Sequence, residues 1–128
     1  MKSTEKQLKQ ILKLNGFFSL TSGLVLCFGY EPIADLIRAK IPQVLLYIGM
    51  GLILFSTTVL YEAVKLTTSY KAVVSIIIQD WLWVLGSLII ILLQVFNLNN
   101  TGYLLIFMVA IAVALFAILQ RKYLQKNN

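Results

Sequence analysis

Residues 81–120 read WLWVLGSLIIILLQVFNLNNTGYLLIFMVAIAVALFAILQ and contain no charged side chain. A helix needs about 20 apolar residues to cross the hydrocarbon of a bilayer, so this stretch is too long for one span and long enough for two. The segment 97–102, NLNNTG, lies near its middle and gathers residue types that favour turns. The stretch therefore predicts two membrane-spanning helices joined by a short loop.

Charged residues divide the rest of the chain in a similar way. We predict four spans, at about residues 11–30, 43–62, 72–96 and 103–121. None shows the alternation of a strand, and four segments are too few to close a barrel, so helices are the remaining way to satisfy the backbone in lipid. Short loops favour antiparallel neighbours. The predicted fold is one domain over residues 1–128, an all-α integral membrane protein with an up-down four-helix transmembrane bundle.

The composition also indicates that lipid is the main solvent of this chain. Hydrophobic residues make up 59% of the 128 residues, charged residues make up 12%, and the mean hydropathy is +0.86. Soluble domains carry about 25% charged residues. The chain has no histidine and a single cysteine, Cys27, so the commonest metal ligands and the usual acid–base group at neutral pH are missing. We expect no metal, no cofactor and no enzymatic activity.

The positions of Lys and Arg predict the orientation, because loops on the cytoplasmic side are rich in both. One side of the predicted bundle carries Lys2, Lys6, Lys9, Lys13, Lys65, Lys71, Arg121, Lys122 and Lys126, and the other carries only Arg38 and Lys40. We therefore expect a multi-pass protein with both termini cytoplasmic, in a bacterial inner membrane. This distribution accounts for the net charge of +6 without nucleic-acid binding, and it favours contact with anionic lipids of the inner leaflet.

The first outer loop is predicted to contain a short helix over about residues 32–41. Pro32 can open a helix. The apolar residues then fall on one side at helical spacing, and they are Ile33, Leu36, Ile37 and Ile41. This pattern is typical of an amphipathic helix lying in the membrane interface, and a cap over a cavity of the bundle is the alternative.

Helices in lipid associate through close packing of small residues, and the sequence provides faces suited to it. These faces are Gly49, Ser56 and Ala63 in the second span, Ala110, Ala114 and Ala117 in the fourth, and Ser19 with Gly23 in the first.

A shift of 65 residues reveals a weak internal similarity between the first and third spans. It aligns Asn15, Phe18, Leu20 and Ser22 with Asp80, Trp83, Leu85 and Ser87, in that order. One interpretation is a duplicated helical hairpin, in which the two copies run in the same direction.

Asp80 is the most informative residue. It follows Lys71 by nine residues, or ~13 Å along a helix, which places it inside the hydrocarbon. An aspartate there costs about 3 kcal/mol, so it should face the interior of the bundle. The candidate site residues are Asp80, Ser87 and Gln94, which form a polar line on the third span, then Asn15, Ser19 and Ser22 on the first span, and Trp83.

These residues allow two interpretations. In the functional one, the polar lines border a partly hydrated cavity, in which Asp80 binds a proton, a cation or the polar head of an apolar ligand, with Trp83 as a wall. In the structural one, Asp80 bonds to Asn15, Ser22 or a tyrosine, or reaches toward Lys13, and sets the helix register.

The size and four-span plan resemble those of the small multidrug transporters. That family uses a membrane carboxylate in its first helix, where this chain has Asn15, whereas Asp80 lies in the third span. Because of this difference, we do not assign the function of that family to this chain. The best hypothesis is a transport or small-ligand-binding protein that uses Asp80, and the alternative is a non-catalytic accessory or structural subunit of a membrane complex. Either is compatible with a homo-oligomer or a membrane partner protein.

Overall fold

The computed structural model describes residues 3–94 and 97–127, and within these ranges the chain forms four helices and no strand. All four are long and apolar enough to cross a membrane, as the sequence predicts. Lys2, the side chain of Lys126 and residues 95–96 of the third predicted span lie outside the described part. The helices are α1 (Ser3–Ile37), α2 (Gln43–Val64), α3 (Tyr70–Leu92) and α4 (Asn100–Asn127).

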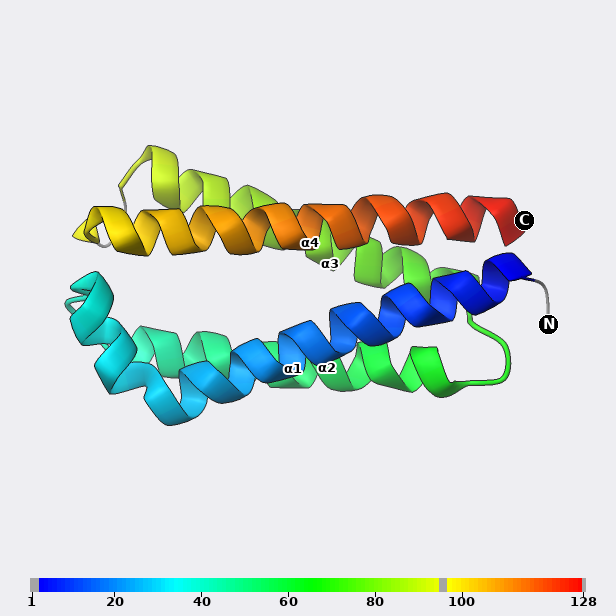
Figure 1. Ribbon diagram of the computed structural model, residues 1–128, viewed down its shortest axis with the longest axis horizontal. Helices are drawn as coiled ribbons and strands as arrows, with labels where there is room; N and C mark the ends of the chain where they lie inside the picture. Colours follow the sequence, from blue (N-terminus) through cyan, green and yellow to red (C-terminus); the bar gives the residue numbers. More distant parts are fainter. Residues whose placement is uncertain (1–2, 95–96, 128) are drawn as a thin grey trace.

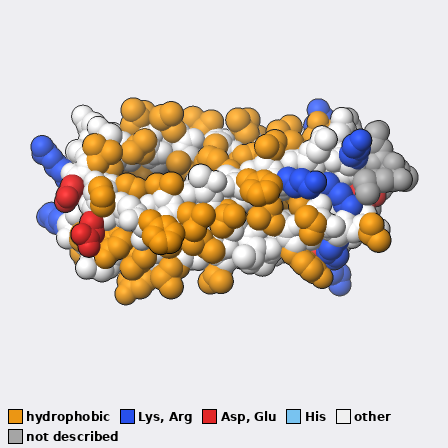
Figure 2. All heavy atoms as spheres, turned by 60° about the horizontal axis from the view of Figure 1, so that its bottom comes forward, with side chains coloured by type: hydrophobic (Ala, Val, Ile, Leu, Met, Phe, Trp, Pro, Cys, Tyr) orange, Lys and Arg blue, Asp and Glu red, His pale blue; other side chains and the backbone are white. Residues whose placement is uncertain are grey.

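The helices run up and down as two hairpins laid side by side (Figure 1). Helix α1 packs on α2, α3 packs on α4, and α1 also packs along α4, whereas α2 and α3 scarcely touch. The first and last described residues lie at the same end of the bundle, together with the loop 65–69. We call this the basic end. Figure 2 shows hydrophobic side chains over the middle of the molecule and Lys and Arg gathered toward its two ends.

The core lies toward the basic end and draws on all four helices. Its residues follow one another mostly at intervals of three or four, the spacing that places side chains on one face of a helix. They are Leu8, Leu12, Val59, Ala63, Val73, Ile76, Ile77, Ala117 and Leu124. This seam brings the interior-facing side chains of α1, α3 and α4 together at one level of the bundle.

Helices α1 and α2 approach most closely where two glycines meet. A Cβ atom added to Gly23 would lie 2.8 Å from the carbonyl oxygen of Gly49, and one added to Gly49 would lie 2.8 Å from that of Gly23. Ser56 and Ala63 continue the same buried face of α2. The predicted small-residue face of the second span is therefore an interhelical contact.

The outer part of α1 differs from the prediction. Instead of a separate helix over 32–41, the chain continues α1 through a bend at Gly29, where φ is −117° and ψ is 21°. Pro32 explains the bend, because it has no N–H group to bond the carbonyl of Phe28 and its ring crowds that carbonyl. The helix ends at Ile37, since Arg38 takes a left-handed conformation with φ 59°.

Beyond the bend, α1 covers the beginning of α4 (Figure 1). Ala34 and Ile37 are buried there, whereas Leu36 and Ile41, which the prediction placed on the same apolar side as Ile37, are exposed. The backbone N–H of Asn99 donates to the carbonyl of Ile37 at 3.1 Å. The segment thus joins the two hairpins at the end opposite the basic end.

Polar contacts hold the loop 65–69 at the basic end in place. Glu62 forms an ion pair with Lys65 at 3.0 Å and accepts a hydrogen bond from the backbone N–H of Ser69 at 3.0 Å. The Ser69 hydroxyl in turn accepts from the backbone N–H of Ala72 and caps α3. Lys9 of α1 donates to the carbonyl of Leu66 at 2.7 Å. These contacts set where α3 starts relative to α1.

Candidate functional site

Asn15, Asp80 and Gln120 meet in the interior, one each from α1, α3 and α4. The Gln120 amide donates to Oδ2 of Asp80 at 2.8 Å, and the Asn15 amide donates to the same oxygen at 3.1 Å. The Asn15 amide also lies 2.9 Å from Oε1 of Gln120. Each side chain therefore contacts the other two. We call these three residues the polar cluster.

Ser19 extends the polar cluster by one helical turn of α1. Its hydroxyl donates to Oδ1 of Asn15 at 3.4 Å. Asn15 and Gln120 are 0% exposed, Asp80 is 1% exposed and Ser19 is 4% exposed. Among the described residues, no buried side-chain nitrogen or oxygen lacks a hydrogen-bond partner. The polar cluster is thus sealed and internally satisfied.

The partners of Asp80 are neutral. Both amides direct their nitrogen atoms at its carboxyl group, and the one ion pair among the described residues is that of Lys65 with Glu62. Lys13, a partner that the sequence suggested, is exposed on α1. The carboxyl group of Asp80 is therefore buried without a compensating positive charge in the described part of the chain.

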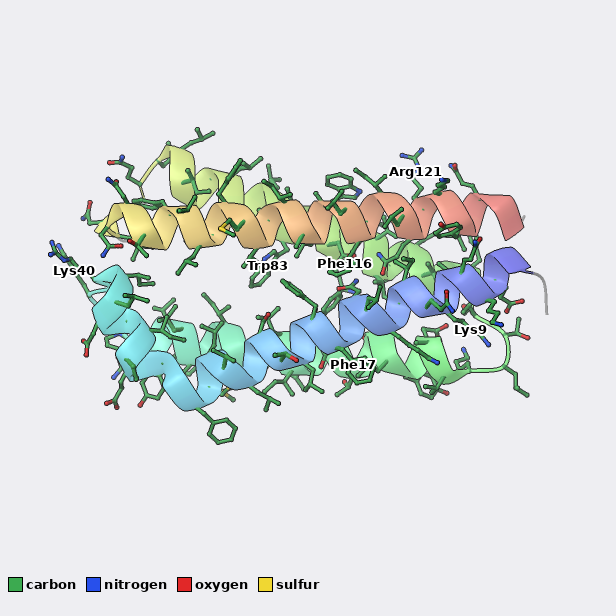
Figure 3. All side chains as sticks on the ribbon, viewed as in Figure 1. Lys9, Phe17, Lys40, Trp83, Phe116 and Arg121 are labelled. Carbon is green, nitrogen blue, oxygen red and sulfur yellow. The ribbon has the colours of Figure 1, made fainter. Side chains whose placement is uncertain are left out.

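Apolar packing closes the polar cluster on two sides. Toward the basic end lie Leu8 and Leu12 of α1 and Leu124 of α4, all in the buried core. In the other direction, the rings of Phe18 and Phe116 meet edge to face, with centroids 5.6 Å apart. Figure 3 shows Phe116 on the side of α4 that faces α1. Buried leucines therefore lie one helical turn from Asn15 and from Gln120, in the direction of the basic end.

The structure brings together Asn15, Ser19 and Asp80 from the predicted set, and it separates the others from them. Ser87 is buried, but its hydroxyl donates to the carbonyl of Trp83 within α3 at 2.8 Å. Trp83 is half-buried on the side of α3 toward α1 (Figure 3). Ser22 is also half-buried, and the hydrogen bonds found for the cluster in the described part of the chain do not include it.

Gln94 does not continue the polar line of α3. The helix ends at Leu92, and Gln94 is exposed in a left-handed conformation with φ 50°. Helices commonly stop in this way, with one residue past the cap in the left-handed region. The predicted line assumed that helical geometry extends to residue 96, and the earlier stop removes Gln94 from the face of Asp80.

Gln120 belongs to the polar cluster and was absent from the predicted set. In the sequence, Gln120 stands out only as the last uncharged residue before Arg121. Its spacing carried a usable signal, because Ala110, Val113, Ala117, Gln120 and Leu124 are all buried and recur at intervals of three and four. A polar residue on the small-residue face of α4 would have pointed inward.

The polar cluster does not line either of two hollows on the surface of the described residues. The first, of about 660 Å³, lies between α2 and α3 and includes Phe55, Thr58, Ser75 and Gln79. The second, of about 420 Å³, lies between α3 and α4 near the basic end. Comparison of the chain with protein-family models, curated protein sequences and solved structures found no match.

Proposed function

We propose that this chain is a small multi-pass protein of a bacterial inner membrane, with both termini cytoplasmic, and that Asp80 is the proton-binding group of a transport or small-ligand-binding protein. Four apolar helices and the concentration of Lys and Arg at one end support the membrane placement. The observation that carries the proposal is the burial of Asp80 among neutral partners.

The charge of Asp80 is the reason for choosing a proton. A buried carboxylate that is hydrogen-bonded only to amides remains an uncompensated charge, which is costly in a medium of low dielectric constant. Binding a proton removes that charge and requires no cavity. The amides of Asn15 and Gln120 both donate to the carboxyl group, and each also carries an acceptor oxygen that rotation of the amide would offer to a protonated carboxyl group.

The surroundings of the polar cluster support a gated proton site over an open one. Leu12 and Leu124 cover it toward the basic end, and the Phe18–Phe116 pair covers it in the other direction. Displacement of either layer would expose Asp80 to one side only. Access from alternate sides is what coupling of a proton to the movement of a solute requires.

Infrared difference spectroscopy of the protein in lipid tests this proposal without knowledge of the solute. A protonated carboxyl group has a carbonyl band that a carboxylate lacks. We expect such a band to appear and disappear reversibly as the pH is varied between mildly acidic and mildly alkaline values, and to be lost in Asp80→Asn. Asp35→Asn is the matched control, because Asp35 is the chain's other aspartate and is exposed.

Two results would contradict the proton-binding role. One is a band that persists unchanged in Asp80→Asn. The other is a folded wild-type protein whose Asp80 carboxyl group shows no change of protonation over the whole range. Proton uptake by proteoliposomes, compared between wild type and Asp80→Asn, extends the test from binding to transport.

A second candidate function is a non-catalytic accessory or structural subunit of a membrane complex. The complete hydrogen bonding of the polar cluster favours it, because such a cluster can set the register of α1, α3 and α4 without any ligand. In that case Asp80→Asn changes the resistance of the bundle to unfolding in detergent and leaves its infrared response to pH unaltered. Co-purification of a stable partner from native membranes would also support this function.

A further inference from the structure

We propose that the hollow between α3 and α4 binds the phosphate group of an anionic membrane lipid. It is lined by Trp81 of α3 and by Ile118, Arg121, Lys122 and Gln125 of α4. This inference rests on the membrane placement proposed above and not on proton binding by Asp80. It assigns a defined site to a lipid contact that the charge distribution alone leaves unlocalised.

The four α4 residues form one graded strip along the helix. Their spacing of three, four and seven residues from Ile118 keeps them on the same face. From the middle of the bundle outward the strip is apolar at Ile118, cationic at Arg121 and Lys122, and polar and uncharged at Gln125. Over ~10 Å of helix it follows the order of acyl chain, phosphate and headgroup in a lipid.

The positive charges of Arg121 and Lys122 are not neutralised by an acidic side chain in the described part of the chain, and the Lys122 ammonium lies over the Tyr123 ring, 5.7 Å from its centroid, where it keeps its charge. No acidic residue occurs in α4, and neither Arg121 nor Lys122 has an acidic partner among the described residues. Figure 3 shows Arg121 pointing outward from α4, on the side away from α1. Its planar guanidinium can bond two phosphate oxygens at once, and Lys122 adds a second positive charge.

Trp81 completes the opposite wall of the hollow. It is 41% exposed, so its ring can pack against an acyl chain while its indole N–H donates to a polar group. Its neighbour Asp80 is turned inward to Gln120, so the carboxyl group is engaged within the bundle. The hollow therefore presents an aromatic wall and two cations without an exposed acid on its lining.

Trp81 also provides a direct probe. The chain has two tryptophans, so Trp83→Phe leaves Trp81 as the only one. We would reconstitute this variant in nanodiscs of phosphatidylcholine that contain a minor fraction of brominated phosphatidylglycerol, and in matched discs with brominated phosphatidylcholine. Bromine quenches tryptophan fluorescence on contact. We expect stronger quenching by the anionic lipid at equal mole fraction, and loss of this excess in Arg121→Gln/Lys122→Gln.

Lys6→Gln/Lys13→Gln is the matched control, because it removes the same charge from exposed positions of α1 near the same end. The excess quenching should survive in this variant. Equal loss in both double variants would show a diffuse charge effect and overturn the site. Inorganic phosphate should not abolish the excess, since it has no acyl chain; displacement by phosphate would assign the hollow to a free anion instead.

Native mass spectrometry of the wild-type protein gives a second measurement that needs no tryptophan substitution. We expect retention of phosphatidylglycerol over phosphatidylcholine, and at least a severalfold drop in that preference in Arg121→Gln/Lys122→Gln. Equal retention of the two lipids by wild type would overturn the proposal. The infrared response of Asp80 is independent of these results, so failure of one proposal is distinguishable from failure of the other.

Discussion

The side-chain amide of Gln120 lies 2.8 Å from Oδ2 of Asp80, the shortest contact of the polar cluster, and it joins α4 to α3 in the interior. Both side chains are essentially inaccessible to solvent. Because neither can turn to water, the stability of the bundle should depend on the partner that each provides for the other.

Gln120→Leu should therefore destabilise the protein. The change leaves one oxygen of Asp80 with fewer donors, and a buried polar group deprived of a partner costs about 1–3 kcal/mol. In membrane proteins one hydrogen bond between side chains contributes about 0.6 kcal/mol on average. Gln120 makes two such bonds, one to Asp80 and one to Asn15, so we expect the free energy of unfolding to fall by about 1–2 kcal/mol. Unfolding in mixed detergent micelles measures it. Gln125→Leu, at an exposed position of the same helix, should change the free energy of unfolding by far less.

Asn15→Asp should make stability depend on pH. The Asn15 amide nitrogen is 3.1 Å from Oδ2 of Asp80, and two carboxyl groups at this separation cannot both carry a charge. At high pH the second charge opposes folding, and protonation at low pH removes the repulsion. The stability of the variant relative to wild type should thus rise as the pH falls. If the difference in the free energy of unfolding between Asn15→Asp and wild type stayed constant with pH, residues 15 and 80 would not be in contact.

Gly49→Ala should weaken the packing of α1 on α2. The added methyl group would lie 2.8 Å from the carbonyl oxygen of Gly23, so the helices must separate. Overpacking of this kind costs about 1–3 kcal/mol. Gly51→Ala is the control, because nothing lies within 4 Å of its added methyl group, and alanine's higher helix propensity should stabilise α2 by up to about 1 kcal/mol. Similar effects of the two substitutions on thermal unfolding would contradict this contact.

Asn99→Ala should loosen the junction between the hairpins. The Asn99 side chain accepts from the backbone N–H of Gly102 at 2.8 Å, which caps α4, and donates to the carbonyl of Leu36 at 2.8 Å. Loss of an N-cap alone costs about 0.5–2 kcal/mol. Hydrogen exchange should speed up in the first turn of α4 and the last turn of α1. Asn100→Ala, at an exposed neighbouring position, should leave exchange in α1 unchanged.

Several features could be predicted from local sequence because their physical cause is local. The apolar length of each segment determines a helix, and the turn-forming residues around Asn99 separate the last two. Asp80 could be identified as an interior residue because a charge amid apolar residues is too costly to face lipid. The meeting of Asn15 with Asp80 agrees with the polar faces predicted for the first and third spans.

Other features depended on where helices stop and how they rotate. Gln94 does not lie on the same helix face as Asp80, because α3 ends at Leu92. The end of a helix within a run of apolar residues is hard to predict from the sequence. The segment after Pro32 is part of α1, and its buried residues Ala34 and Ile37 pack at the start of α4. Propensity alone does not reveal such a partner.

The sequence by itself determined the number of helices, their apolar surfaces and the need for Asp80 to face inward, because each follows from the transfer energy of single residues or short segments. Only the tertiary structure decided that Gln120 is the partner of Asp80, that α1 packs on α4 while α2 and α3 stay apart, and that the polar cluster is closed. These outcomes depend on the mutual rotation and depth of four helices. Contacts between distant parts of the chain set that arrangement, and no single segment encodes it.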